Sequence, residues 1–324
     1  MLLSLAPILL LVALLSTSVA LFGSDASYGP NQVALVVAAG ATMLVGWRRG
    51  MSWRQIQDGM VGAITVSIMP MMILLSVGAL IGSWIISGTV PGMIFYGLQL
   101  LNPDIFYAAS AVICALASLS LGSSWTVAGT LGIGLMGIAT TYGLSPAITA
   151  GAIISGAYFG DKLSPLSDTT NLAAAAVGVD LFEHIKNMLW TTLPAFALAL
   201  LFFAIIGSEG AAAPDDITRI RAALSDQFAI TPWVLSPLVL MLAMIYFKIP
   251  AYPAILLCTL CGTAYGAVFQ PEVVRTMALT AHPDSPAPLL QGLWMALFSG
   301  YQSPAEMDQL SQLLDKGGLA SMLN

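Results

Sequence analysis

Charged side chains are scarce in this sequence. Its 324 residues include 10 Lys and Arg and 16 Asp and Glu, which together make up 8% of the chain. Soluble domains typically carry about 25% charged residues, so this chain has too few charges to cover a water-facing surface. Hydrophobic residues make up 58% of the sequence, and the mean hydropathy is +0.88. This composition predicts a membrane protein that crosses the bilayer several times.

Other absences exclude several classes of function. Acidic residues outnumber basic ones, the formal net charge is −6, and no basic patch of the kind that binds nucleic acid is present. Cys258 and Cys261 have the spacing of a redox or zinc pair, but they lie in an apolar run without cationic or ligating neighbours. The sequence has no HExxH motif, no glycine-rich phosphate loop and no nucleophile paired with a base. We therefore expect no enzymatic activity, no cofactor and no nucleic-acid partner.

Apolar runs of membrane-spanning length alternate with short polar turns. A helix needs about 20 mostly apolar residues to cross a bilayer, so the pattern predicts an all-α polytopic membrane protein with about 8–10 transmembrane helices. The expected spans lie at 1–22, 33–47, 60–86, 105–121, 124–142, 188–207, 231–247 and 249–270, with a further apolar run near 288–302.

Three segments between the spans behave differently. The run 90–101 is too short to cross, which predicts a re-entrant or interfacial segment. Apolar residues recur at helical spacing within 217–228, which predicts a short helix on the outer surface. The polar, proline-rich stretch 271–287 is expected to be an outer loop.

The loop 47–58 sets the expected orientation of the chain. It carries Arg48, Arg49 and Arg54 against a single acidic residue, Asp58. Short cytoplasmic loops of membrane proteins are enriched in Lys and Arg, so we expect this loop in the cytoplasm.

Three charged residues fall outside the predicted loops and ends: Asp161, Lys162 and Asp168. The apolar flanks at 146–159 and 172–177 are each too short to span, which suggests one crossing that is interrupted in its middle. Pro165 has no backbone N–H and its ring clashes with the preceding turn, so the helix must break near it. Broken helices of this kind form ion and substrate sites near the bilayer midplane in secondary transporters.

Oxygen-bearing side chains are concentrated at this break. Seven of them lie within eleven residues: Asp161, Ser164, Ser167, Asp168, Thr169, Thr170 and Asn171. Na⁺ is a hard cation that prefers oxygen ligands, by extension from Ca²⁺ and Mg²⁺. A carboxylate in a poorly hydrated site holds its proton more tightly, so a proton and Na⁺ compete for the same oxygens. The segment therefore predicts a cation and proton site, with Na⁺ at Asp161 and Asp168.

Less specific interpretations stay open at this point. The polar residues are also compatible with a solvated loop that exposes Asp161 and Lys162. Asp168 is also compatible with a role as the N-cap of the second half-helix alone. Lys162 has three roles open to it: a salt bridge to an aspartate, a mimic of substrate charge, or a surface lysine. The Gly/Ser turn at 120–126 is either a tight helix connection or part of the transport path.

The stretch from 122 to 195 resembles the NhaC family of Na⁺/H⁺ antiporters. The likeness is carried by the block GDKLSPLSDTTNLA, and the run VGALIGSWIISGTVPGMIFYGLQLLNP (77–103) is similar to an earlier helix of that family. The resemblance implies a bacterial-type inner-membrane protein with inverted repeats that exchanges Na⁺ for H⁺. It assigns Asp161, Ser164, Asp168, Thr169 and Asn171 to the ion path, with Lys162, Ser167 and Thr170 as secondary candidates.

Family members continue past the position where this chain stops. We therefore expect 1–324 to form a single membrane domain, equivalent to the N-terminal part of an NhaC-like antiporter, with the second half of the repeat missing. Two alternatives follow. One is a Na⁺- or H⁺-coupled transporter of a small organic acid or amino acid of malate/lactate or methionine type, with Lys162 binding a carboxylate. The other is an inactive fragment that needs a second polypeptide or a homo-oligomer in the lipid bilayer.

Overall fold

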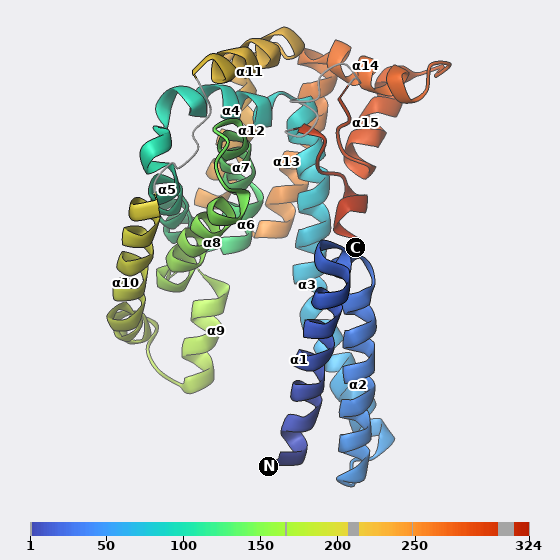
Figure 1. Ribbon diagram of the computed structural model, residues 1–324, viewed down its shortest axis with the longest axis vertical. Coiled ribbons are helices and arrows are strands. Elements are labelled where there is room, and N and C mark those ends of the chain that lie inside the picture. Colours follow the sequence, from blue (N-terminus) through green and yellow to red (C-terminus); the bar gives the residue numbers. More distant parts are fainter. Residues whose placement is uncertain (1, 166, 207–213, 248, 304–313, 324) are drawn as a thin grey trace. The chain divides into compact units, whose positions relative to one another are not determined.

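The structure is a computed structural model that describes residues 2–165, 167–206, 214–247, 249–303 and 314–323. Every regular element in these ranges is a helix (Figure 1). Four helices are long and apolar enough to cross a membrane, at Leu5–Phe22, Pro30–Arg48, Leu181–Ile206 and Tyr252–Phe269. Two bent helix pairs raise this number to six if each pair is one span, and three shorter apolar helices are also present. The predicted all-α polytopic class is confirmed.

The chain forms two compact units. Residues 1–72 build the first, which contains α1 (Leu2–Phe22), α2 (Pro30–Arg48) and the first part of α3 (Trp53–Ile86). Helices α1 and α2 form a hairpin in which the Ser18 hydroxyl donates to the Asn31 side-chain carbonyl across 2.8 Å. Ser52 and Gln55 form a capping box that opens α3, because each side chain bonds the other residue's backbone N–H.

The second unit runs from Ile73 to Met322, and its centre is the pair α5 (Phe106–Leu121) and α8 (Pro146–Leu163). These helices lie side by side in Figure 1, and glycine lets their backbones touch. A Cβ atom at Gly156 would lie 2.0 Å from the carbonyl oxygen of Ala111, and one at Gly160 would lie 2.3 Å from that of Ala115. Such small-residue contacts are typical of helix pairs in membranes.

Two predicted spans are bent or divided. The segment predicted as one span at 124–142 contains two helices, α6 (Ser124–Gly129) and α7 (Leu131–Thr141), separated at Thr130, where φ is −118° and ψ is −80°. Glycines on both sides of Thr130 lower the helix propensity there. Helix α4 (Thr89–Leu100) bends by 71° from the end of α3. Its Val90, Ile94 and Leu98 side chains are buried, which favours a re-entrant segment over an interfacial one.

The other helices of this unit are α9 (Asp168–Val177), α10 (Leu181–Ile206), α11 (Pro214–Gln227), α12 (Ser236–Tyr246), α13 (Ala251–Phe269), α14 (Pro271–Ala281) and α15 (Pro288–Phe298). Helix α11 confirms the short helix predicted near 217–228. The outer loop predicted at 271–287 is wrong in its first part, because Pro271 opens α14 and the apolar face of that helix, including Val274 and Met277, is buried.

Candidate functional site

The helix break lies between the end of α8 at Leu163 and the start of α9 at Asp168, which is narrower than the predicted interruption between 159 and 172. Helix α8 continues through Asp161 and Lys162 to Leu163, and α9 begins at Asp168. Ser164 has an extended backbone (φ −78°, ψ 126°), as the residue before a proline prefers. The proline, and not the charged residues, therefore decides where the helix ends.

Ser167, and not Asp168, caps the second half-helix. Its hydroxyl accepts a hydrogen bond from the backbone N–H of Thr170 (3.4 Å), and its carbonyl accepts one from Asn171 N–H (3.0 Å). Asp168 stands at the first helical position instead. The side chain of Asp168, one of the two predicted Na⁺ ligands, lies outside the described part of the structure.

Asp161 is buried and bonded to a distant segment. Its side chain is 6% exposed, and its Oδ2 atom accepts a hydrogen bond from the hydroxyl of Ser124 across 3.0 Å. Ser124 is 3% exposed and opens α6, 37 residues earlier in the chain. The interpretation of Asp161 as a solvated loop residue is therefore wrong, and the Gly/Ser turn contributes to the polar site.

Polar side chains of α9 bond carbonyl groups at the end of α8 and in the segment that follows it. The Thr170 hydroxyl donates to the carbonyls of Asp161 (3.2 Å) and Lys162 (3.1 Å). The Asn171 amide donates to the carbonyls of Pro165 (2.9 Å) and Ser167 (2.8 Å). The last carbonyls of a helix lack partners within the helix, so these bonds tie the two half-helices together across the break.

The other candidates divide between buried and exposed positions. Ser164 and Ser167 are fully buried, whereas Thr169 is exposed and its hydroxyl lies 2.9 Å from that of Ser167. Lys162 is exposed in a shallow pocket of about 230 Å³ between α8 and α10, where Phe159 stacks on Phe196 with ring centroids 4.0 Å apart. No acidic partner of Lys162 occurs among the described side chains, which do not include that of Asp168.

Two buried hydroxyl groups on α5 were missed by the sequence reasoning. Ser110 and Ser118 are both 0% exposed, and neither hydroxyl has a hydrogen-bond partner within the described ranges. The Cβ atom of Ser118 lies 2.8 Å from the position that a Cβ at Gly160 would take, so Ser118 packs beside the residue that precedes Asp161. Each unpaired buried polar group costs about 1–3 kcal/mol, and no described contact offsets this cost at Ser118. A serine inside an apolar helix carries no signal in sequence that separates this role from packing.

The described ligand set suits a monovalent cation. No group of three or more His, Cys, Asp or Glu side chains lies together among the residues placed by the structure. Near the break, the described side chains supply the buried carboxylate of Asp161 and buried hydroxyl groups, beside the carbonyl end of α8. These are hard oxygen ligands of the kind that Na⁺ prefers.

Comparisons with known proteins identify the family of the chain. A model of the Na⁺/H⁺ antiporter family matches residues 156–324. The chain is 37% identical to the Na⁺/H⁺ antiporter NhaC of Alkalihalophilus pseudofirmus, covering 91% of this chain and 60% of that protein. It is 36% identical to a malate-2H⁺/Na⁺-lactate antiporter of Bacillus subtilis, with the same coverage of both chains. It is 32% identical to the arginine/ornithine antiporter ArcD of Halobacterium salinarum, covering 98% of this chain and 62% of that protein.

The chain therefore spans about three fifths of the length of the curated relatives it matches. No solved structure gives a significant match.

Proposed function

The chain belongs to the Na⁺/H⁺ antiporter family, and we propose that it exchanges Na⁺ for H⁺ across the cell inner membrane. It acts in this proposal as a secondary transporter, not an enzyme, with Na⁺ and H⁺ as substrates and no resident cofactor. Asp161 stands at the centre of the site. Around it, the proposed ion path includes Ser164, Asp168, Thr169 and Asn171, with Ser167 and Thr170 as secondary members.

The burial of the Asp161 carboxyl group is the observation that carries the proposal. This group is 6% exposed and has one described side-chain partner, the Ser124 hydroxyl. An isolated charge in a poorly hydrated site is costly, so the site is most stable when it is neutral. Asp161 becomes neutral by binding either H⁺ or Na⁺, but not both. Mutually exclusive binding at one carboxylate, together with alternating access to the two sides of the membrane, is sufficient for exchange.

The Na⁺ ligands are assigned by their chemistry and burial. Asp161 supplies a carboxylate oxygen, and Ser124 turns a lone pair toward the ion. The unpaired hydroxyl of Ser118 adds a third oxygen from α5. Thr170 and Asn171 act differently in this assignment, because their side chains bond carbonyl groups and hold the half-helices together. They are positioning residues on the path.

A second candidate function is exchange coupled to a small organic acid or amino acid. Two relatives are named as malate/lactate and arginine/ornithine antiporters, at identities close to that of the NhaC relative. The lysine proposed from sequence to bind the carboxylate, Lys162, is exposed beside two aromatic rings. An exposed lysine is not by itself a carboxylate site, so Lys162 adds little support to this second function.

Transport by purified protein in liposomes tests the proposal. An imposed Na⁺ gradient is expected to drive proton movement, read by a pH-sensitive dye inside the vesicles, and Asp161→Asn is expected to abolish it. Asp58→Asn makes the same chemical change at an exposed carboxyl group and is expected to leave exchange unchanged. Full exchange by Asp161→Asn would exclude this site.

Two further measurements complete the test. Counterflow of labelled malate, lactate or methionine, compared with that of ²²Na⁺, separates the two candidate functions. Light scattering of the purified protein, alone and with a co-expressed second polypeptide, tests the expected partner or homo-oligomer.

A further inference from the structure

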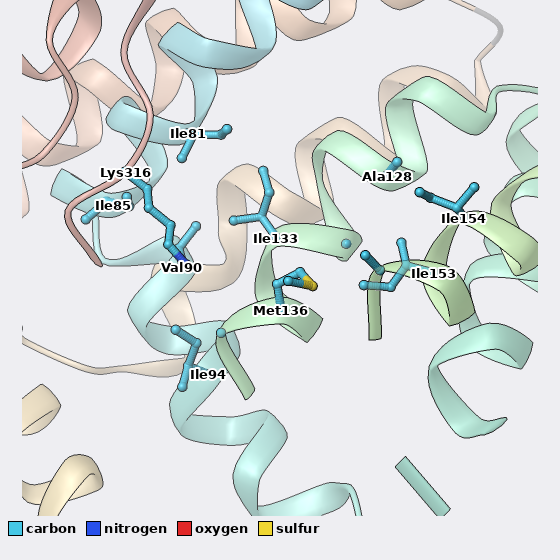
Figure 2. Close-up of a pocket in the computed structure, with 13 residues that line it drawn as sticks. Ile81, Ile85, Val90, Ile94, Ala128, Ile133, Met136, Ile153, Ile154 and Lys316 are labelled. Atoms are coloured by element: carbon cyan, nitrogen blue, oxygen red, sulfur yellow. The ribbon is translucent and has the colours of Figure 1, made fainter. Parts of the chain in front are cut away.

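A second cavity lies in the unit formed by residues 73–322, and it is almost entirely apolar. Its volume of about 360 Å³ falls within the range of small-molecule sites, about 300–1,000 Å³. Helices α3, α4, α6, α7 and α8 line it (Figure 2). Typical lining side chains are Ile81, Ile85, Ile94, Met136 and Ile153.

Lys316 is the exception among the lining residues. Figure 2 shows its side chain reaching among the apolar side chains, with its nitrogen directed toward Val90 of α4. The residue is exposed, and it also lines a neighbouring polar pocket with Ser299 and Asp315.

The backbone around Lys316 is held firmly against α3. The backbone N–H of Gly318 donates to the carbonyl of Gly78 across 2.7 Å, and the carbonyl of Lys316 accepts from Tyr301 N–H across 3.2 Å. Gly317 has a φ of +85°, and a Cβ atom there would lie 2.6 Å from the backbone nitrogen of Gly82. Only glycine is compatible with that contact, so the fold fixes the backbone position from which the Lys316 side chain extends.

No acidic side chain lines the cavity, and none forms an ion pair with Lys316 among the described residues. A positive charge that faces apolar walls without a partner is unfavourable, and an anionic ligand would remove that cost. The apolar walls in turn match a hydrocarbon group.

We propose that this cavity binds a small aliphatic monocarboxylate, with its carboxylate on Lys316 and its hydrocarbon chain among the isoleucines. The lining excludes two related classes of ligand. An amino acid would place its ammonium group where the described lining offers no acid, and a dicarboxylate would place its second carboxylate against apolar side chains.

The cavity and the Asp161 site share a helix. Ile153 and Asp161 both lie on α8, about 12 Å apart along its axis at 1.5 Å per residue. Monocarboxylate binding is therefore separate from the proposed cation site and does not depend on Na⁺/H⁺ exchange by this chain.

Calorimetric titration of the purified full chain in detergent, without Na⁺, tests the proposal. Isovalerate is the probe, and it is expected to bind saturably. Isoamyl alcohol lacks the carboxylate, leucine adds an ammonium group, and malate adds a second carboxylate, so each is expected to bind at least about tenfold more weakly. Decanoate represents a membrane fatty acid, so its comparison with isovalerate distinguishes that source from a small carboxylate. Binding of decanoate alone, or equal binding of isovalerate and isoamyl alcohol, would overturn the proposal.

Single-residue variants test whether isovalerate binds in this cavity. Lys316→Gln is expected to weaken isovalerate binding at least about tenfold, and Lys316→Arg to retain it. Ala150→Phe fills the cavity while leaving the lysine in place, and it is expected to abolish binding. Lys186→Gln removes the same charge from an exposed position on α10 and serves as the matched control. Unchanged isovalerate affinity in both Lys316→Gln and Ala150→Phe would overturn the assignment, whatever the outcome for Na⁺/H⁺ exchange.

Discussion

The hydroxyl group of Ser124 donates a hydrogen bond to the carboxylate of Asp161 across 3.0 Å, and both side chains are buried. Ser124 opens α6 directly after the turn that ends α5, and Asp161 lies in the last turn of α8 before the break at Pro165. Two interruptions of apolar helices therefore meet at one polar contact. Irregular backbone at membrane depth is tolerated only where it is buried in protein or lines a cavity, and this meeting point satisfies that condition.

Replacement of Ser124 tests its proposed role as a Na⁺ ligand. Ser124→Ala removes one oxygen from the site, so the Na⁺ concentration for half-maximal exchange is expected to rise about tenfold. Ser225→Ala is a matched control, because the Ser225 hydroxyl is exposed and bonds carbonyls of its own helix. An unchanged Na⁺ dependence in Ser124→Ala would remove Ser124 from the ligand set.

Replacement of Ser118 is expected to change the stability of the protein and its Na⁺ binding in opposite directions. Its buried hydroxyl has no described partner, so Ser118→Ala is expected to raise the free energy of unfolding by about 1–3 kcal/mol while weakening Na⁺ binding. Ser110→Ala removes the other unpaired hydroxyl of α5 and is expected to stabilise the protein without changing Na⁺ binding. Denaturant unfolding in detergent and ²²Na⁺ binding measure the two effects. A loss of Na⁺ affinity of equal size in both variants would contradict the assignment to Ser118.

Replacement of Gly160 tests the packing of α5 against α8 that positions Asp161. A Cβ atom at Gly160 would lie 2.3 Å from the carbonyl oxygen of Ala115, so Gly160→Ala is expected to force α5 and α8 apart and to destabilise the protein by about 1–3 kcal/mol. Gly151 lies on the same helix with nothing near its Cβ position, so Gly151→Ala is expected to be neutral or stabilising by up to about 1 kcal/mol. Unfolding of the two variants under identical conditions makes the comparison. Equal stability would show that the close contact is not required.

The pH dependence of Na⁺ affinity tests competition at one carboxylate. Under mutually exclusive binding, a higher proton concentration means that more Na⁺ is required to occupy the site. In the limit where the proton is fully bound, the half-saturating Na⁺ concentration is expected to rise about tenfold for each unit decrease in pH. Titrations of ²²Na⁺ binding at several pH values measure this slope. A Na⁺ affinity that is independent of pH would mean that the two cations use separate sites.

Local sequence was sufficient to predict the membrane class and the existence of the break. Hydropathy acts over a window of about 20 residues, and a proline acts on its own turn, so both signals are readable without a partner segment. The residues at which the break begins and ends could not be predicted from the local sequence. Asp161 and Lys162 look like loop residues, yet they remain in α8 because the charged side chains do not interrupt the backbone hydrogen bonds, whereas Pro165 does.

The sequence by itself determined that this is a helical membrane protein with oxygen-rich side chains around Pro165, since those properties depend on composition and near neighbours. The tertiary structure decided that Ser124 is the partner of Asp161, that Ser118 lies beside Gly160, and that Lys316 enters an apolar cavity. Each of these relationships joins residues from different helices. They depend on how closely the helices approach one another, which the glycine contacts between α5 and α8 and between α3 and residues 317–318 set through steric fit.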